Sequence, residues 1–115
     1  MIDLSNIKKI YVYQKKVDLR YGINKLSILA QELVALSNMK HTLFIFYGTT
    51  NKNIKIIELD NDGWWLYQKK LHTGKYLLDF ENIESIEKYE LELLLNGLSV
   101  KTFRKHKEAK ISVNY

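Results

Sequence analysis

The residue types that most often catalyse reactions or hold metals occur here without the spacing that such chemistry needs. His41, His72 and His106 are scattered, and none has a second ligand at the i, i+4 or short-loop spacing of a metal site. There is no cysteine, and hence no thiol nucleophile or thiolate metal site. The serines lack the flanking glycines of a nucleophile elbow. The sequence therefore predicts no enzyme: no catalytic residue, no metal ligand and no cofactor.

One acidic segment superficially resembles the start of a calcium-binding loop. Residues 58–63 read Glu-Leu-Asp-Asn-Asp-Gly, but the twelfth position, where such a loop needs a bidentate glutamate, is Lys69. Asp-Asn-Asp-Gly is also strong turn chemistry, and strand-forming residues flank it on both sides. We interpret residues 54–59 and 64–71 as a β-hairpin that turns at residues 60–63.

Aromatic and basic residues alternate along the second strand of this hairpin. Strand geometry places Trp65 and Lys69 on one face and Trp64 and Lys70 on the other. One face must be core, so at most one tryptophan can meet a partner. Against nucleic acid, the lysines would contact phosphates and the outer aromatic would pack on a sugar or a base. The alternative, that each tryptophan belongs to the core, stays open.

The elements that must position these residues include both strands and helices. We expect strands at residues 10–13 and 43–46, the latter covered on both faces because its apolar run is continuous. Asp18 is the expected N-cap of a first helix that ends near residue 37, and Ser85 that of a second helix that ends at Gly97. The predicted fold class is α+β, a single domain in which two helices pack on a mostly antiparallel sheet.

Length and charge fit this picture. The chain has 115 residues and a formal net charge of +5. The charge divides into +4 over residues 1–40, +1 over 41–80, −4 over 81–100 and +4 over 101–115. We expect a domain over residues 1–100 and a basic extension over 101–115. There is no secretory signal pattern or apolar run long enough to span a membrane, so we expect a cytoplasmic protein.

The order and spacing of several segments resemble the Orf2-like (TnpB) accessory proteins of the IS sixty-six family of bacterial insertion sequences. The resemblance covers about residues 10 to 110. It rests on five segments: Asp18–Gly22, Leu43–Gly48, Asp60–Gly63, Leu66–Tyr76 and Leu91–Leu98. Relatives often carry several arginines after the second segment, whereas residues 49–53 here read Thr-Thr-Asn-Lys-Asn. The resemblance implies a non-catalytic helper that acts beside a separate transposase in transposition.

Two hypotheses follow for how such a helper works. In the first, basic side chains neutralise phosphates of DNA near the element ends; the candidates are Lys15, Lys16, Arg20, Lys55, Lys69, Lys70, Lys75, Arg104, Lys105 and Lys107. In the second, the protein is an interaction module without DNA contact. The acidic helix at residues 86–96, with Glu87, Glu90 and Glu92, and the aromatic hairpin would then dock the transposase or another protein of the element. A charge cluster can also be a solvated face without a partner.

Overall fold

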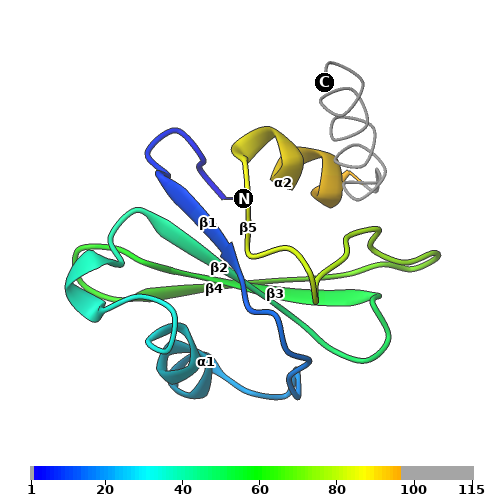
Figure 1. Ribbon diagram of the computed structural model, residues 1–115, viewed down its shortest axis with the longest axis horizontal. Helices are drawn as coiled ribbons and strands as arrows, with labels where there is room; N and C mark the ends of the chain where they lie inside the picture. The colour runs from blue at the N-terminus through cyan, green and yellow to red at the C-terminus, as the bar shows by residue number, and fades with distance from the viewer. Residues whose placement is uncertain (1, 97–115) are drawn as a thin grey trace, which may run out of the picture.

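Five strands form one sheet in the structure, a computed structural model that describes residues 2–96 (Figure 1). The strands are β1 (Lys9–Val12), β2 (Thr42–Tyr47), β3 (Asn53–Leu59), β4 (Trp64–Lys70) and β5 (Ser85–Ile86). Their order across the sheet is β4-β3-β2-β1-β5. Only β1 and β2 run parallel, and the other three pairings are antiparallel. The predicted α+β class with a mostly antiparallel sheet is confirmed.

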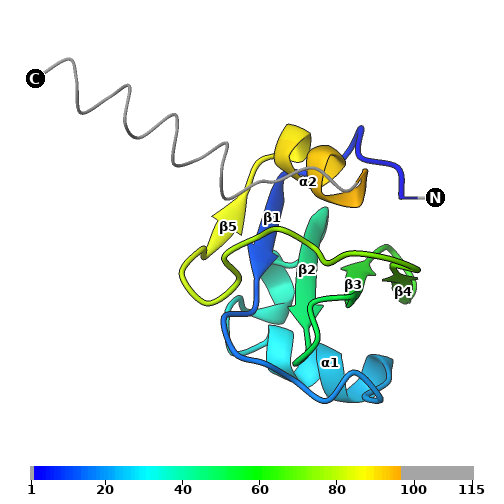
Figure 2. The same ribbon diagram turned by 90° about the vertical axis from the view of Figure 1, so that its right-hand side faces the viewer.

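The parallel pair requires a crossover between β1 and β2, and a helix supplies it. Helix α1 (Ile23–Ala30) and the short 3-10 turn η1 (Leu36–Asn38) connect the two strands. Helix α2 (Lys88–Leu95) follows β5 and lies on the other side of the sheet from α1 (Figure 2). Each face of the sheet is therefore covered by one of the two helices.

Strand β2 lies at the centre of the sheet and is buried along its whole length. Its side chains alternate between two apolar clusters. Phe44 and Phe46 pack with Leu26 of α1, whereas Ile45 and Tyr47 belong to the cluster that contains Leu91 of α2. The continuous apolar run was expected to be a strand covered on both faces, and the structure confirms it.

The chain between β4 and β5 has no regular secondary structure, yet it contributes to the core on the α2 side. Tyr76, Leu78 and Phe80 are buried there, and the rings of Phe80 and Tyr47 stack with centroids 4.5 Å apart. The backbone N–H of Tyr76 donates to the carbonyl oxygen of Asn51 at 2.7 Å. This contact joins the irregular segment to the loop between β2 and β3.

The limits of the first helix differ from the prediction at both ends. The N-cap of α1 is Gly22 and not Asp18, because the Asp18 carboxylate accepts hydrogen bonds from the backbone and guanidinium of Arg20. The helix ends at Ala30 and not near residue 37. As a result Leu33 lies beyond the end of the helix and is 41% exposed.

The second helix also begins later than predicted. Ser85 pairs with β1 as part of β5, and Glu87 caps α2 through a reciprocal capping box with Glu90. None of the described helices has the length and apolar character needed to cross a membrane. The expected helix stop at Gly97 and the basic extension over 101–115 lie outside the described residues.

Candidate nucleic-acid interface

Exposed lysines gather where β1, β2 and β4 end. Because β1 and β2 are parallel, their carboxyl ends lie at one end of the sheet, and the antiparallel hairpin brings the start of β3 and the end of β4 to the same place. We call this region the basic end. Its exposed lysines are Lys15, Lys16, Lys52, Lys70 and Lys75.

Backbone hydrogen bonds hold the loops of the basic end together. The N–H of Leu71 donates to the carbonyl oxygen of Lys52 at 2.7 Å, next to the Asn53–Lys70 pair of the hairpin. The N–H of Val17 donates to the carbonyl oxygen of Tyr47 at 2.9 Å. The lysines on these loops are therefore carried by a connected backbone framework.

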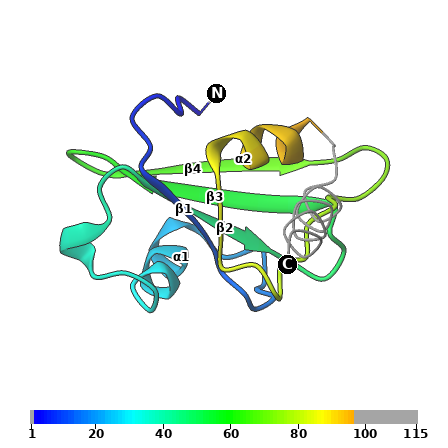
Figure 3. The ribbon, with the colours of Figure 1, turned by 45° about the horizontal axis from the view of Figure 1, so that its top comes forward.

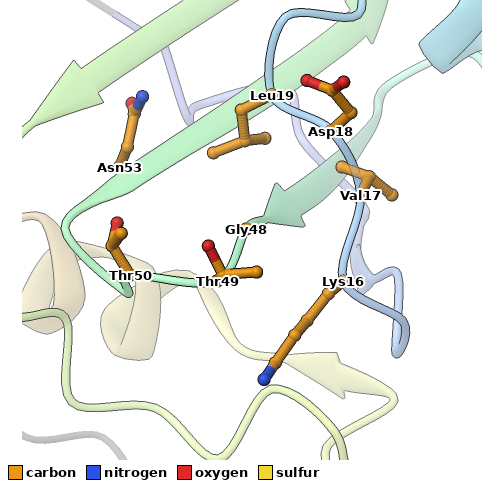
Figure 4. Close-up of a pocket in the computed structure, with 8 residues that line it drawn as sticks. All are labelled: Lys16, Val17, Asp18, Leu19, Gly48, Thr49, Thr50 and Asn53. Carbon is orange, nitrogen blue, oxygen red and sulfur yellow. The ribbon is translucent and has the colours of Figure 1, made fainter.

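A pocket of about 450 Å³ lies between two of these loops, residues 16–19 and 48–53 (Figure 4). Gly48 allows the loops to approach, since a Cβ there would lie 3.2 Å from Cδ1 of Leu19. Thr49 and Thr50 supply hydroxyl groups to the lining and Lys16 supplies a cation. Hydroxyls and ammonium groups are typical phosphate contacts in protein–DNA interfaces. Sequence reasoning did not select the threonines, although their position directly after a buried strand was a usable signal.

Acidic residues also lie near the basic end and moderate its potential. The pKa of the Tyr47 hydroxyl is raised by burial and further by the nearby carboxylates of Glu81 and Asp79. Tyr47 is the last residue of β2. The basic end is thus a surface of mixed sign, because the exposed Glu81 and the half-buried Asp79 lie near its lysines.

Arg20 is highly exposed and is engaged by a neighbour. Its side chain is 91% exposed and forms a salt bridge with Asp18, with Nη2 to Oδ2 at 2.6 Å. The guanidinium lowers the pKa of the Asp18 carboxyl to about 2, mainly through its side-chain hydrogen bonds. Binding of Arg20 to a phosphate would replace this ion pair, so its charge is not freely available.

Lys55 is not a surface residue, contrary to its selection as a phosphate contact. It is 6% exposed and its ammonium donates a 2.9 Å hydrogen bond to the carbonyl oxygen of Tyr21. The side chain leaves β3 on the α1 side and is covered by the loop that precedes α1. Sequence alternation alone could not show this, because the long crossover loop supplies the cover.

Lys69 is the remaining basic candidate within the described residues. Lys69 is exposed, but its ammonium donates to the carbonyl oxygen of Leu95 at 2.7 Å, at the last residue of α2. That contact compensates the negative end of the helix dipole. Arg104, Lys105 and Lys107 lie outside the described residues, as does His106.

The three glutamates selected for a protein partner do not form one surface. Glu87 and Glu92 are exposed, whereas Glu90 is 2% exposed and its Oε1 accepts the N–H of Glu87 at 2.9 Å. Glu90 occupies the third position of the helix, where a capping box requires a glutamate or glutamine. We therefore assign Glu90 to helix capping and remove it from the candidate docking surface.

The two tryptophans separate as strand alternation predicts. Trp64 packs against the α1-side core, whereas Trp65 is 55% exposed. The indole N–H of Trp65 donates to Oδ2 of Asp60 at 2.6 Å, which ties its ring to the hairpin turn. Asp60 also accepts the N–H groups of Asp62 and Gly63, so its carboxylate organises the turn.

Within residues 2–96, no group of three or more candidate ligands could hold a metal ion.

The fold defines a class: small α+β proteins with one mixed sheet that is covered by a helix on each face, here with a group of exposed lysines on the loops at one end. A family comparison is more specific. Residues 8–105 match the family described as "IS66 Orf2 like protein". The chain belongs to this transposition-associated family, which confirms the resemblance noted in its sequence.

A curated relative is also similar to most of this chain. The chain is 27% identical over 94 residues to a protein of Sinorhizobium fredii that is named "Uncharacterized protein y4hO". The match covers 78% of this chain and 80% of the relative. No solved structure matches the chain.

Proposed function

We propose that this protein is a non-catalytic accessory factor in transposition of an insertion sequence and that it binds the DNA of the element ends through the basic end. Family membership supports a role in transposition. The observation that carries the proposal further is the convergence of Lys15, Lys16 and Lys70 on one end of the sheet from three separate segments. The protein would act in the cytoplasm, beside the transposase of the same element.

The physical basis of binding would be mostly electrostatic. Lysines on loops can reach the phosphates of a duplex without entering a groove, and each contact releases counterions from the DNA. Residues 49–53 contribute hydroxyl and amide groups in place of the arginines of many relatives, so we expect binding of moderate strength. Lys75 and Lys52 extend the same surface.

The test is fluorescence anisotropy with a labelled element-end duplex over a series of salt concentrations. With about five phosphates contacted, the logarithm of the association constant should fall against the logarithm of salt with a slope of about −4 to −5. A Lys15→Gln, Lys16→Gln, Lys70→Gln variant should reduce the magnitude of that slope by about 0.9 per lost contact. Lys88→Gln, an exposed lysine on α2, is the matched control. A salt-independent signal, or no binding at low salt, would overturn the proposal.

A second candidate is docking of the element's transposase on α2. Two exposed residues of that helix favour it, since Tyr89 and Glu92 place an aromatic ring and a carboxylate at its surface, and the exposed N-cap Glu87 precedes them. Glu92→Lys should weaken co-purification with the transposase, whereas the Lys15/Lys16/Lys70 variant should not. If both variants retain the transposase equally, α2 is not the docking surface.

A further inference from the structure

A second hollow lies at the opposite end of the sheet from the basic end, where β1 and β2 begin. It has a volume of about 510 Å³, and we call it the amino-end groove. Its lining comes from the start of β1, from the turn after α1 and from the residues around the start of β2. The start of β1 and the segment that leads into β2 lie close together in Figure 3. The lining residues used below are Lys8, Lys9, Tyr11, Leu33, Val34 and Lys40.

One wall of the amino-end groove is apolar and well supported. The ring of Tyr11 stacks on Phe44 of the core with centroids 5.7 Å apart, and Val34 packs against the same core cluster. Leu33 differs, because α1 ends at Ala30 and the N–H groups of Leu33 and Val34 both donate to the Ala30 carbonyl. This turn directs Leu33 outward and leaves it 41% exposed.

The rim of the groove is basic. Lys8, Lys9 and Lys40 are exposed, and within residues 2–96 no carboxylate lies within salt-bridge distance of them. Among the described residues that line the groove, none is an aspartate or a glutamate. The ammonium of Lys9 lies 5.4 Å from the centroid of the Tyr11 ring, so a cation is held directly beside the apolar wall.

The combination of an apolar wall and a cationic rim indicates the chemistry of the ligand. Phosphates would satisfy the lysines but would leave Leu33 and the wall in water. A peptide with leucine or phenylalanine flanked by aspartate or glutamate would satisfy both, because its apolar side chains are buried while its carboxylates meet the lysines. Apolar anchors surrounded by complementary charge are typical of protein–protein contacts.

We propose that the amino-end groove binds an acidic segment of a partner protein, with an apolar side chain of that segment seated against Leu33 and Tyr11 and its carboxylates beside Lys8, Lys9 and Lys40. This site shares no residue with the basic end. The inference therefore does not depend on DNA binding.

The probe is a short fluorescein-labelled synthetic peptide in which leucines at i and i+4 are flanked by glutamates. Its affinity for the full chain is measured by anisotropy, alongside two control peptides: one with the leucines replaced by serine and one with the glutamates replaced by lysine. The parent peptide should bind, and each control should bind about tenfold more weakly or worse, a difference of about 1.4 kcal/mol per tenfold. Amide chemical shifts in the full chain should change around Leu33 and Lys9.

Two variants of the protein complete the test. Leu33→Ser and the Lys8→Glu, Lys40→Glu double variant should each weaken peptide binding about tenfold, and both alter exposed side chains. Lys88→Glu on α2 is the control for charge reversal, and thermal unfolding verifies that each variant is folded. Equal binding of the serine peptide would overturn the proposal, since the apolar wall would then have no role. So would competition of the peptide by element-end duplex at this groove, which would make it a nucleic-acid surface.

Discussion

The ammonium nitrogen of Lys55 lies 2.9 Å from the carbonyl oxygen of Tyr21, and this hydrogen bond joins the middle of β3 to the loop that precedes α1. The same positive charge contributes to the lowered pKa of Asp18, after the larger effects of Arg20. A lysine within a basic sequence can therefore serve the fold rather than a ligand. Burial distinguishes Lys55 from the exposed lysines around it.

Replacement of this lysine should reduce stability without altering DNA contacts. Lys55→Met keeps the aliphatic length but leaves the carbonyl of Tyr21 without its donor, so we expect the free energy of unfolding to fall by about 1–3 kcal/mol. Urea denaturation measures the change. Lys52→Met alters an exposed lysine in the loop directly before β3 and should stay within about 0.5 kcal/mol of the parent protein. Equal stability of the two variants would contradict the structural role.

The capping box at α2 predicts unequal roles for neighbouring glutamates. Glu90→Ala removes the acceptor of the Glu87 N–H and should lower the free energy of unfolding by about 1 kcal/mol. Glu90→Gln retains an acceptor and should recover part of the loss. Glu92→Ala, at an exposed position of the same helix, should cost less than about 0.5 kcal/mol. A ranking in which Glu92 matters more would refute this assignment, with chemical denaturation as the measurement.

The close approach of Gly48 to Leu19 can be tested by substitution at both positions. In Gly48→Ala the new Cβ would lie 3.2 Å from Cδ1 and 3.3 Å from Cγ of Leu19, so the Leu19 side chain must move by a few tenths of an ångström. We expect the free energy of unfolding to fall by about 1 kcal/mol. Gly63→Ala is the control, since a Cβ there meets nothing within 4 Å. In a Leu19→Ala background the effect of Gly48→Ala should shrink. A double-mutant cycle from thermal unfolding would show no coupling if the contact is unimportant.

The Asp18–Arg20 pair predicts a dependence on acid pH. The pKa of Asp18 in the folded protein is about 2, below its ordinary value of 3.8. Its stabilising contribution is therefore complete above the unfolded pKa and is lost as the pH falls from about 4 toward 2. Titration of the Asp18 carboxyl by NMR should show its midpoint rising in Arg20→Gln. It should stay below 3.8, because the Arg20 backbone N–H still donates to the carboxylate. An unchanged midpoint would mean that the guanidinium does not bind Asp18 in solution.

Local patterns predicted the strands better than the helix starts. The run at residues 43–46 is apolar at every position and Asp-Asn-Asp-Gly at 60–63 is strong turn chemistry, so the residue types alone indicate both structures. Asp18 and Ser85 were both plausible N-caps by residue type. Asp18 instead binds its neighbour Arg20, and Ser85 pairs with Tyr11 of β1. A capping preference of about 1 kcal/mol is easily overridden by such contacts.

The residues of the candidate site could be predicted only in part, because strand pairing and burial decide which of them lie together at the surface. Lys15, Lys16, Lys70 and Lys75 are exposed as expected, but only the parallel pairing of β1 and β2, together with the antiparallel pairings of β3, shows that they share one end of the sheet. Burial of Lys55 and Glu90 depends on a crossover loop and on a helix cap, respectively. Residue type gives no information about either.

Strand β2 sets the distance between the two proposed binding sites. The six residues of β2 extend roughly 20 Å at about 3.3 Å per residue, and they separate the basic end from the amino-end groove. A buried central strand with neighbours on both sides makes that separation rigid. A DNA duplex and a protein segment bound at the two ends would not compete, and the sheet would act as a spacer of fixed length between them. Tethering of this kind raises the effective concentration of one ligand near the other without any direct contact between them.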